Sequence, residues 1–155
     1  MLIGVIGGDE AEGEALRLAY EVGREVASRG HTLVSGGRGG VMRESCRGAK
    51  EAGGLTVGIL PGDDLADANE FIDIPVITGI GYARNTIVAR TANALVAVDG
   101  SYGTLSEIAF GLNVGRPIIG LATWELRDGS GNQPPIERVA TAVEAVDACE
   151  RAVPA

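Results

Sequence analysis

The sequence predicts a single α/β domain whose mostly parallel sheet of about six or seven strands carries helices on both faces. Short, continuous apolar runs read as strands buried on both sides, and they alternate along the chain with segments of helical periodicity. Glycine-rich turns separate the two kinds of segment. A length of 155 residues suits one domain, and we expect residues 1–155 to form one without a linker.

Seven short runs rich in Val, Ile and Leu are the expected strands. The first ends at a Gly-Gly pair and the third at a proline, both of which interrupt strands. In chain order the expected strands are Leu2–Ile6, Thr32–Val34, Leu55–Leu60, Ile72–Ile77, Ala94–Val98, Pro117–Leu121 and Ile136–Val139.

Five segments between these strands have apolar residues at helical spacing. Gly30 closes the first, and Thr141 with Glu144 forms the capping box of the last. The expected helices are Glu10–Arg29, Gly40–Ala52, Tyr82–Ala92, Gly103–Leu112 and a segment from Thr141 through about Arg151. Polar loops are expected at Gly62–Glu70 and Arg127–Pro135.

Composition excludes several classes of function. The acidic net charge of −8 argues against general nucleic-acid binding, which needs a basic surface. The chain has no apolar run of about 18 residues and no signal-like start, so we expect a cytoplasmic protein without a membrane partner. One histidine and two distant cysteines predict no metal site, and both cysteines are expected to be buried.

The first glycine-rich loop, Ser35–Met42, leaves a predicted strand and enters a predicted helix. Glycines allow backbone N–H groups to approach a ligand closely, and a helix N-terminus favours an anion. A tight turn alone is the alternative, although four glycines in five residues exceed what a turn needs. The candidate ligand-binding residues here are Gly36, Gly37, Gly39, Gly40 and Met42.

The second glycine-rich loop, Asp99–Glu107, also joins a strand to a helix. Its candidate phosphate-binding residues are Gly100, Ser101, Gly103 and Thr104. Glu107 lies three residues after Thr104 on the same helix face, so it is either a functional acid or the second half of a Thr104–Glu107 capping box. Because the carboxyl ends of parallel strands share one edge, both loops are expected to open there.

Arg84 and Asn85 form the third candidate segment. A basic residue in the first turn of a helix opposes the helix dipole, so a bound anion or Glu107 is expected to favour Arg84 there. The alternative is an exposed arginine on the surface, as we expect for Arg90. The sequence lacks a GxxxxGK[ST] loop, which excludes a P-loop NTPase.

The ordered motifs SGGRGGVM, ILPG, YARN and DGSYGTLSE resemble the LOG-like (SLOG) superfamily over roughly Leu2–Ala152. This Rossmann-like superfamily includes the cytokinin-activating phosphoribohydrolases, often labelled lysine decarboxylase-like, and the molybdenum cofactor carrier proteins. In the hydrolases, the resemblance implies, the Gly-Thr of PGGxGTxxE binds phosphate. The residues matching Arg84 and Glu107 would then act on the N-glycosidic bond.

Two departures separate the chain from the hydrolase pattern. Asp99-Gly100-Ser101 stands where the hydrolases have Pro-Gly-Gly, and Asn85 stands where they usually have lysine. Arg84-Asn85 resembles the carrier branch more closely. The sequence therefore favours a carrier-like protein that binds the molybdenum cofactor or a nucleoside monophosphate, with phosphoribohydrolase as the alternative. A homo-oligomer is implied by the resemblance alone.

Overall fold

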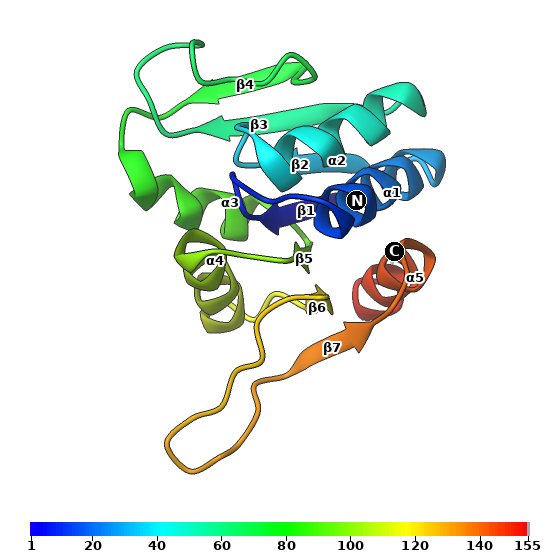
Figure 1. Cartoon of the computed structure of the whole chain (residues 1–155), viewed down its shortest axis with the longest axis vertical. Coiled ribbons are helices and arrows are strands. Elements are labelled where there is room, and N and C mark those ends of the chain that lie inside the picture. The colour runs from blue at the N-terminus through cyan, green and yellow to red at the C-terminus, as the bar shows by residue number, and fades with distance from the viewer. Residues whose placement is uncertain (155) are drawn as a thin grey trace.

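Seven parallel strands form one sheet in the computed structural model, which describes residues 1–154 (Figure 1). The spatial order is β4-β3-β2-β1-β5-β6-β7, and every neighbouring pair is parallel. This confirms the predicted fold class. The strands are β1 (Leu2–Gly7), β2 (Thr32–Ser35), β3 (Thr56–Leu60), β4 (Ile74–Ile77), β5 (Ala94–Val98), β6 (Ile118–Leu121) and β7 (Ile136–Val139).

Helices cover both faces of this sheet (Figure 1). One face carries α1 (Glu14–Ser28), α2 (Gly40–Glu51) and α5 (Ala142–Ala152), whose buried residues form one core cluster with β1 and β5. The other face carries α3 (Asn85–Thr91), preceded by the 3₁₀ helix η1 (Gly81–Arg84), and α4 (Tyr102–Asn113). All five residues of β5 are buried, as a continuous apolar run in a two-sided sheet should be.

The order of the strands places a crevice beside β1. From β1 the chain winds outward through β2, β3 and β4, and then returns to form β5 on the other side of β1. Ligands of open α/β sheets bind where the winding direction reverses, at the carboxyl ends of the strands. The two glycine-rich loops follow β2 and β5 and therefore open at this edge, as the sequence predicted. The strand order places them on either side of the end of β1.

Most element boundaries lie within one residue of the sequence-based expectations, and three elements differ by more. Helix α1 begins at Glu14 rather than Glu10, because Gly13 takes a positive φ of 55° immediately before it. Strand β4 begins at Ile74 rather than Ile72, since the Ile72 N–H bonds back to Asn69 in a turn. The helix expected over Tyr82–Ala92 is divided into η1 and α3.

Other local predictions are confirmed. Thr141 and Glu144 form the reciprocal capping box of α5, with the Thr141 Oγ1 accepting from the Glu144 N–H at 3.2 Å. Gly30 ends α1 with a φ of 74°, and Cys46 and Cys149 are both buried free thiols. No helix within residues 1–154 is both long and apolar enough to cross a membrane.

Candidate ligand-binding site

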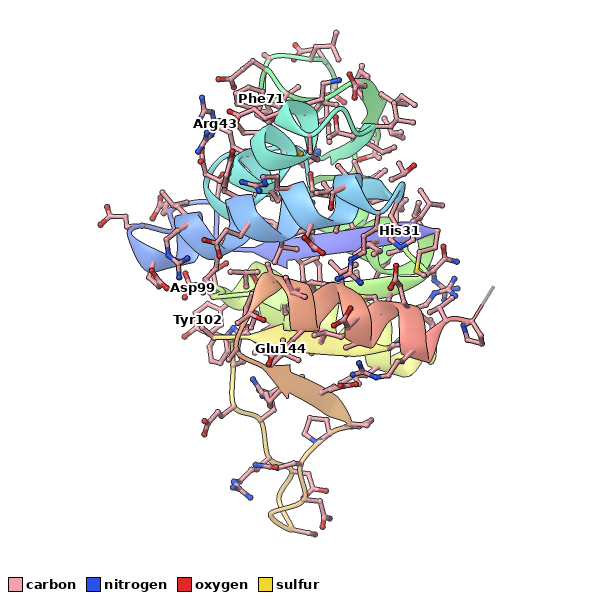
Figure 2. The ribbon with its side chains drawn as sticks, turned by 90° about the vertical axis from the view of Figure 1, so that its right-hand side faces the viewer. His31, Arg43, Phe71, Asp99, Tyr102 and Glu144 are labelled. Carbon is pink, nitrogen blue, oxygen red and sulfur yellow. The ribbon has the colours of Figure 1, made fainter. Side chains whose placement is uncertain are left out.

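A cavity of ≈ 490 Å³ lies at the carboxyl ends of the central strands, between the end of β1, η1 and the start of α4. Figure 2 shows Asp99 and Tyr102 together at this end of the molecule, with His31 at the opposite end. Seven of the predicted site residues line the cavity: Met42, Arg84, Asn85, Ser101, Gly103, Thr104 and Glu107.

The cavity lining does not include the remaining predicted residues, which are Gly36, Gly37, Gly39, Gly40 and Gly100. In the first loop, several backbone N–H groups already have partners within the protein. The Gly37 N–H donates to Ser35 Oγ at 3.1 Å, and the Gly39 N–H donates to Asp9 Oδ1 at 2.7 Å. The N–H of Val41, in the first turn of α2, donates to the Gly8 carbonyl at 3.0 Å. These donors hold the loop against the end of β1.

Arg84 is 6% exposed, so the alternative of an exposed surface arginine is wrong. Its Nε and Nη1 atoms are buried without a hydrogen-bond partner. Nη1 lies 3.7 Å from Glu107 Oε1, which makes an ion pair but exceeds hydrogen-bond length. Of the two partners that the sequence offered for Arg84, Glu107 or a bound anion, Glu107 lies beside it. The guanidinium still has nitrogens without a hydrogen-bond partner.

Glu107 is also 6% exposed, at the first turns of α4. Burial raises the pKa of its carboxyl to about 8, although the Arg84 guanidinium pulls the pKa down. The same burial lowers the pKa of Arg84, against the opposing effect of the Glu107 charge. With this pKa the Glu107 carboxyl is mostly protonated near neutral pH, so it can donate as well as accept a hydrogen bond. The contact with Arg84 becomes an ion pair when Glu107 loses that proton.

The N-terminus of α4 faces the same cavity. Ser101 is the N-cap and forms a reciprocal capping pair with Thr104, whose hydroxyl accepts from the Ser101 N–H at 3.3 Å. The alternative capping box between Thr104 and Glu107 is therefore wrong, because the helix begins earlier than predicted and Thr104 is its third residue. Glu107 has no capping role and remains free for the site.

Asn85 links α3 to α4 across the cavity by hydrogen bonds. Its Nδ2 donates to Ser106 Oγ at 2.9 Å, and the Ser106 hydroxyl donates to the Gly103 carbonyl at 2.7 Å. Asn85 is 4% exposed, so these bonds form in a protected environment. The residue after Arg84 thereby fixes α3 against the second glycine loop.

Six further residues line the cavity that were not among the predicted ones: Gly7, Asp9, Arg38, Tyr82, Tyr102 and Ser106. Gly7 and Asp9 follow β1, so the rule that ligands bind beside a central strand end could have found them. Arg38, Tyr82 and Tyr102 lie inside the motifs already singled out. Asp9 accepts from Gly39 and pairs with Arg38 across 3.2 Å.

The cavity therefore combines a helix N-terminus, an under-satisfied buried guanidinium and a carboxyl that can hold a proton. The first two favour an anionic group on a ligand. Tyr82 and Tyr102, exposed by 77% and 83%, offer aromatic faces at the cavity. Within residues 1–154, no three His, Cys, Asp or Glu side chains are grouped so that they could hold a metal ion.

Comparison with known proteins gives relatives of two kinds. The chain is 49% identical over 122 residues to an uncharacterized protein of Archaeoglobus fulgidus, covering 78% of this chain and 80% of that one. It is 33% identical over 127 residues to the cytokinin riboside 5′-monophosphate phosphoribohydrolase of Mycobacterium tuberculosis, covering 75% of this chain and 67% of that enzyme.

Two solved structures superpose on nearly the whole chain. The molybdenum cofactor binding protein of Rippkaea orientalis superposes with a TM-score of 0.88 at 32% identity, covering 97% of this chain and 95% of that one. The Moco carrier protein of Chlamydomonas reinhardtii superposes with a TM-score of 0.84 at 36% identity, covering 97% and 96%. The SLOG cluster4 family model matches residues 1–149, and the chain belongs to that family.

Proposed function

We propose that this chain binds a small phosphate-bearing ligand, a nucleotide or a pterin cofactor, and holds it as a molybdenum cofactor carrier does. The observation that carries this proposal is Arg84, a buried guanidinium on the cavity wall with two nitrogens that have no hydrogen-bond partner. A buried guanidinium without hydrogen-bond partners destabilises the fold unless a ligand accepts hydrogen bonds from it. The N-terminus of α4 faces the same space and favours the same charge.

The available interactions are sufficient for useful affinity. Charge-assisted hydrogen bonds contribute about 1.5–3 kcal/mol each, and a partly buried helix N-terminus contributes up to about 2 kcal/mol. Micromolar binding requires about −8 kcal/mol, which two or three such contacts with the burial of a ring can supply. The phosphate would lie against Gly103, Thr104 and Arg84.

The other features of the cavity suit a flat, polar ring system. Tyr82 and Tyr102 expose aromatic faces on which a base or a pterin can stack. Asp9 lines the cavity with a carboxylate, which accepts hydrogen bonds from hydroxyl or amino groups of a ligand. The molybdenum cofactor supplies both the phosphate and the pterin that such residues would hold.

Two observations favour a carrier over a hydrolase: the share of each relative that the chain matches, and the residue at position 85. The two cofactor-binding structures match nearly the whole of both chains, whereas the mycobacterial hydrolase is matched over 67% of its length. Asn85 has a structural use here, since it bonds to Ser106 and the second loop. The hydrolases usually carry lysine at that position.

The test is to recover the ligand. The protein is purified from a host that makes the molybdenum cofactor, denatured, and treated with an oxidant that converts any bound pterin to a fluorescent product for chromatography. We expect pterin with the native chain and little with Arg84→Ala, while Arg90→Ala retains it. Equal amounts from all three proteins, or none from the native chain, would contradict the carrier proposal.

Phosphoribohydrolase activity is the second candidate, and Glu107 is the observation that favours it. A carboxyl with a raised pKa beside a guanidinium can protonate the leaving base of a nucleoside 5′-monophosphate, after which water attacks the ribose carbon. The products are the free base and ribose 5-phosphate. Arg84 would anchor the phosphate or the ribose hydroxyls during this reaction.

A panel of nucleoside 5′-monophosphates tests this second function. Release of free base is followed by chromatography for the native chain and for Glu107→Gln, which keeps the shape of the side chain but cannot donate an acidic proton. Release that disappears in Glu107→Gln establishes the hydrolase. A folded native chain that releases no base from any member of the panel excludes it.

We also propose that copies of the chain assemble, as the resemblance implies. The edge strand β4 supports this, because Ile74, Val76 and Ile77 are exposed by 46%, 38% and 48%. Light scattering measures the mass directly. A mass above the 15.9 kDa of one chain is expected, and a mass of one chain would contradict assembly.

A further inference from the structure

The guanidinium of Arg84 packs directly on the backbone of Gly36. A β-carbon placed on Gly36 would lie 1.9 Å from Arg84 Nη1 and 2.6 Å from both Cζ and Nη2. No real side chain tolerates such distances, so residue 36 must lack a β-carbon wherever Arg84 keeps this position. Both residues are buried, and Arg84 also lines the cavity, so the cavity is the space into which a displaced guanidinium would move.

The backbone of Gly36 does not itself demand glycine. Its φ lies outside the positive range that marks Gly37 and Gly40, so alanine can adopt the same conformation. The atoms that an added methyl group would meet belong to the end of a side chain and not to the main chain. An alanine at this position is therefore expected to displace Arg84 rather than to distort the loop.

Part of the backbone of the first glycine loop is already engaged within the protein. Gly37 and Gly39 donate their N–H groups to Ser35 and Asp9, and a β-carbon on Gly40 would meet the Gly8 carbonyl at 2.1 Å. The loop is thus packed against β1 and Arg84. It contacts the cavity through the side chains of Arg38 and Met42.

We propose that Gly36 is a positioning residue that seats the Arg84 guanidinium beside Glu107, and that the first glycine loop serves the site through this seat rather than as a phosphate cradle. The consequence for ligand binding rests on the function proposed above. The seating itself is a property of the free protein and can be tested without a ligand.

The test is a double-mutant cycle on Gly36→Ala and Arg84→Ala. Thermal unfolding without ligand is measured for the native chain, each single variant and the double variant. We expect Gly36→Ala to lower the Tm in the native background and to leave it unchanged when Arg84 is alanine, since the space is then empty. The same decrease in both backgrounds would overturn the seating.

Gly39→Ala is the matched control, because it lies in the same loop but its β-carbon would meet Asp9 Oδ1 at 2.8 Å. We expect its effect on the Tm to be the same in both Arg84 backgrounds. If the change in Tm caused by Gly39→Ala also disappears when Arg84 is alanine, then the dependence on Arg84 is general to the loop and the proposal is wrong.

Ligand binding then tests the functional consequence. Trp124 is the one tryptophan of the chain and its Nε1 donates to the Ser101 carbonyl at 3.2 Å, so its fluorescence reports on the second loop. In a titration with guanosine 5′-monophosphate, Gly36→Ala and Arg84→Ala should each weaken binding at least tenfold, and the double variant should bind no more weakly than Arg84→Ala.

The proposal would be overturned if the fold-losses in affinity of the two single variants multiply in the double variant. It would also be overturned if Gly36→Ala binds the nucleotide as tightly as the native chain. If the native chain does not respond to this nucleotide, the nucleotide-binding part of the proposed function fails. The unfolding cycle still decides whether Gly36 seats Arg84, so the two failures are distinguishable.

Discussion

The two glycine-rich loops have similar compositions but use their glycines differently. In the first loop, Gly36 and Gly37 are buried, and the space a side chain would need is filled by Arg84 and by Leu60. In the second loop, Ser101 and Tyr102 are exposed, and a β-carbon on Gly103 would meet nothing closer than 3.7 Å. The first loop is closed by packing, whereas the second is open to the cavity.

This difference shows that a glycine cluster has two distinct physical causes. Glycine permits another part of the protein to come close, and it also permits a ligand to come close. Only the contacts in the folded chain separate the two. Here they assign the first loop to support of Arg84 and leave the second, with the α4 N-terminus, as the proposed anion site.

The largest expected effect is on the free energy of unfolding, which alanine should lower in the first loop but not in the second. Gly40→Ala places a methyl group 2.1 Å from the Gly8 carbonyl at a residue with a φ of 52°, so it should destabilise the fold by about 2–6 kcal/mol from strain and overlap together. Gly103→Ala, inside α4, should instead be neutral or stabilising by up to about 1 kcal/mol, yet weaken ligand binding. Denaturant titration and calorimetry measure the two quantities. Comparable destabilisation by both substitutions would remove the distinction.

Arg84 should give the next largest effect, on affinity. Arg84→Ala removes about 1.5–3 kcal/mol of charge-assisted hydrogen bonding, which corresponds to roughly 10–150-fold weaker binding of a phosphorylated ligand. Arg90→Ala is the matched control, because Arg90 is exposed at the end of α3 and does not line the cavity. Calorimetry that finds equal losses for the two variants would contradict the role assigned to Arg84.

Glu107 predicts a pH dependence of stability. Its folded pKa of about 8 is above that of an unfolded glutamate, so the folded chain keeps a proton that the unfolded chain has lost. The contribution of this group to the free energy of unfolding is fully present below about pH 4. It is lost as the pH rises to about 8, by at most about 1.4 kcal/mol per pH unit. Glu107→Gln should therefore lose less stability than the native chain between pH 5 and 8. Parallel curves for the two proteins would show that the carboxyl is not held protonated.

The smallest expected effect comes from removing an N-cap, and it distinguishes a loss of helix capping from a loss of ligand binding. Ser101→Ala and Thr141→Ala each remove the N-cap of a helix, α4 or α5, and should each cost about 1 kcal/mol of stability. Only Ser101 lines the cavity, so only Ser101→Ala should also weaken ligand binding. An equal change in affinity from Thr141→Ala would mean that the loss reflects general destabilisation.

Much of the fold could be predicted because the strands are continuous apolar runs and glycines mark their ends. The sequence also predicted that Arg84 needs a bound anion or Glu107 beside it, since the start of a helix is a poor place for an unpaired arginine. The structure places Glu107 there. The sequence predicted one helix over Tyr82–Ala92, and its division into η1 and α3 has no signal in the apolar spacing. The seat that Gly36 provides could not be predicted, because residues 36 and 84 are joined only by the packing of two separate loops.

The most direct test follows backbone amide shifts by NMR during titration with guanosine 5′-monophosphate. The account predicts that the amides of Tyr102, Gly103 and Thr104 shift most, because they lie at the N-terminus of α4 beside the cavity. The amides of Gly37 and Gly39, which already donate within the protein, should shift little. Large shifts confined to the first loop would contradict the assignment of the anion site to the second.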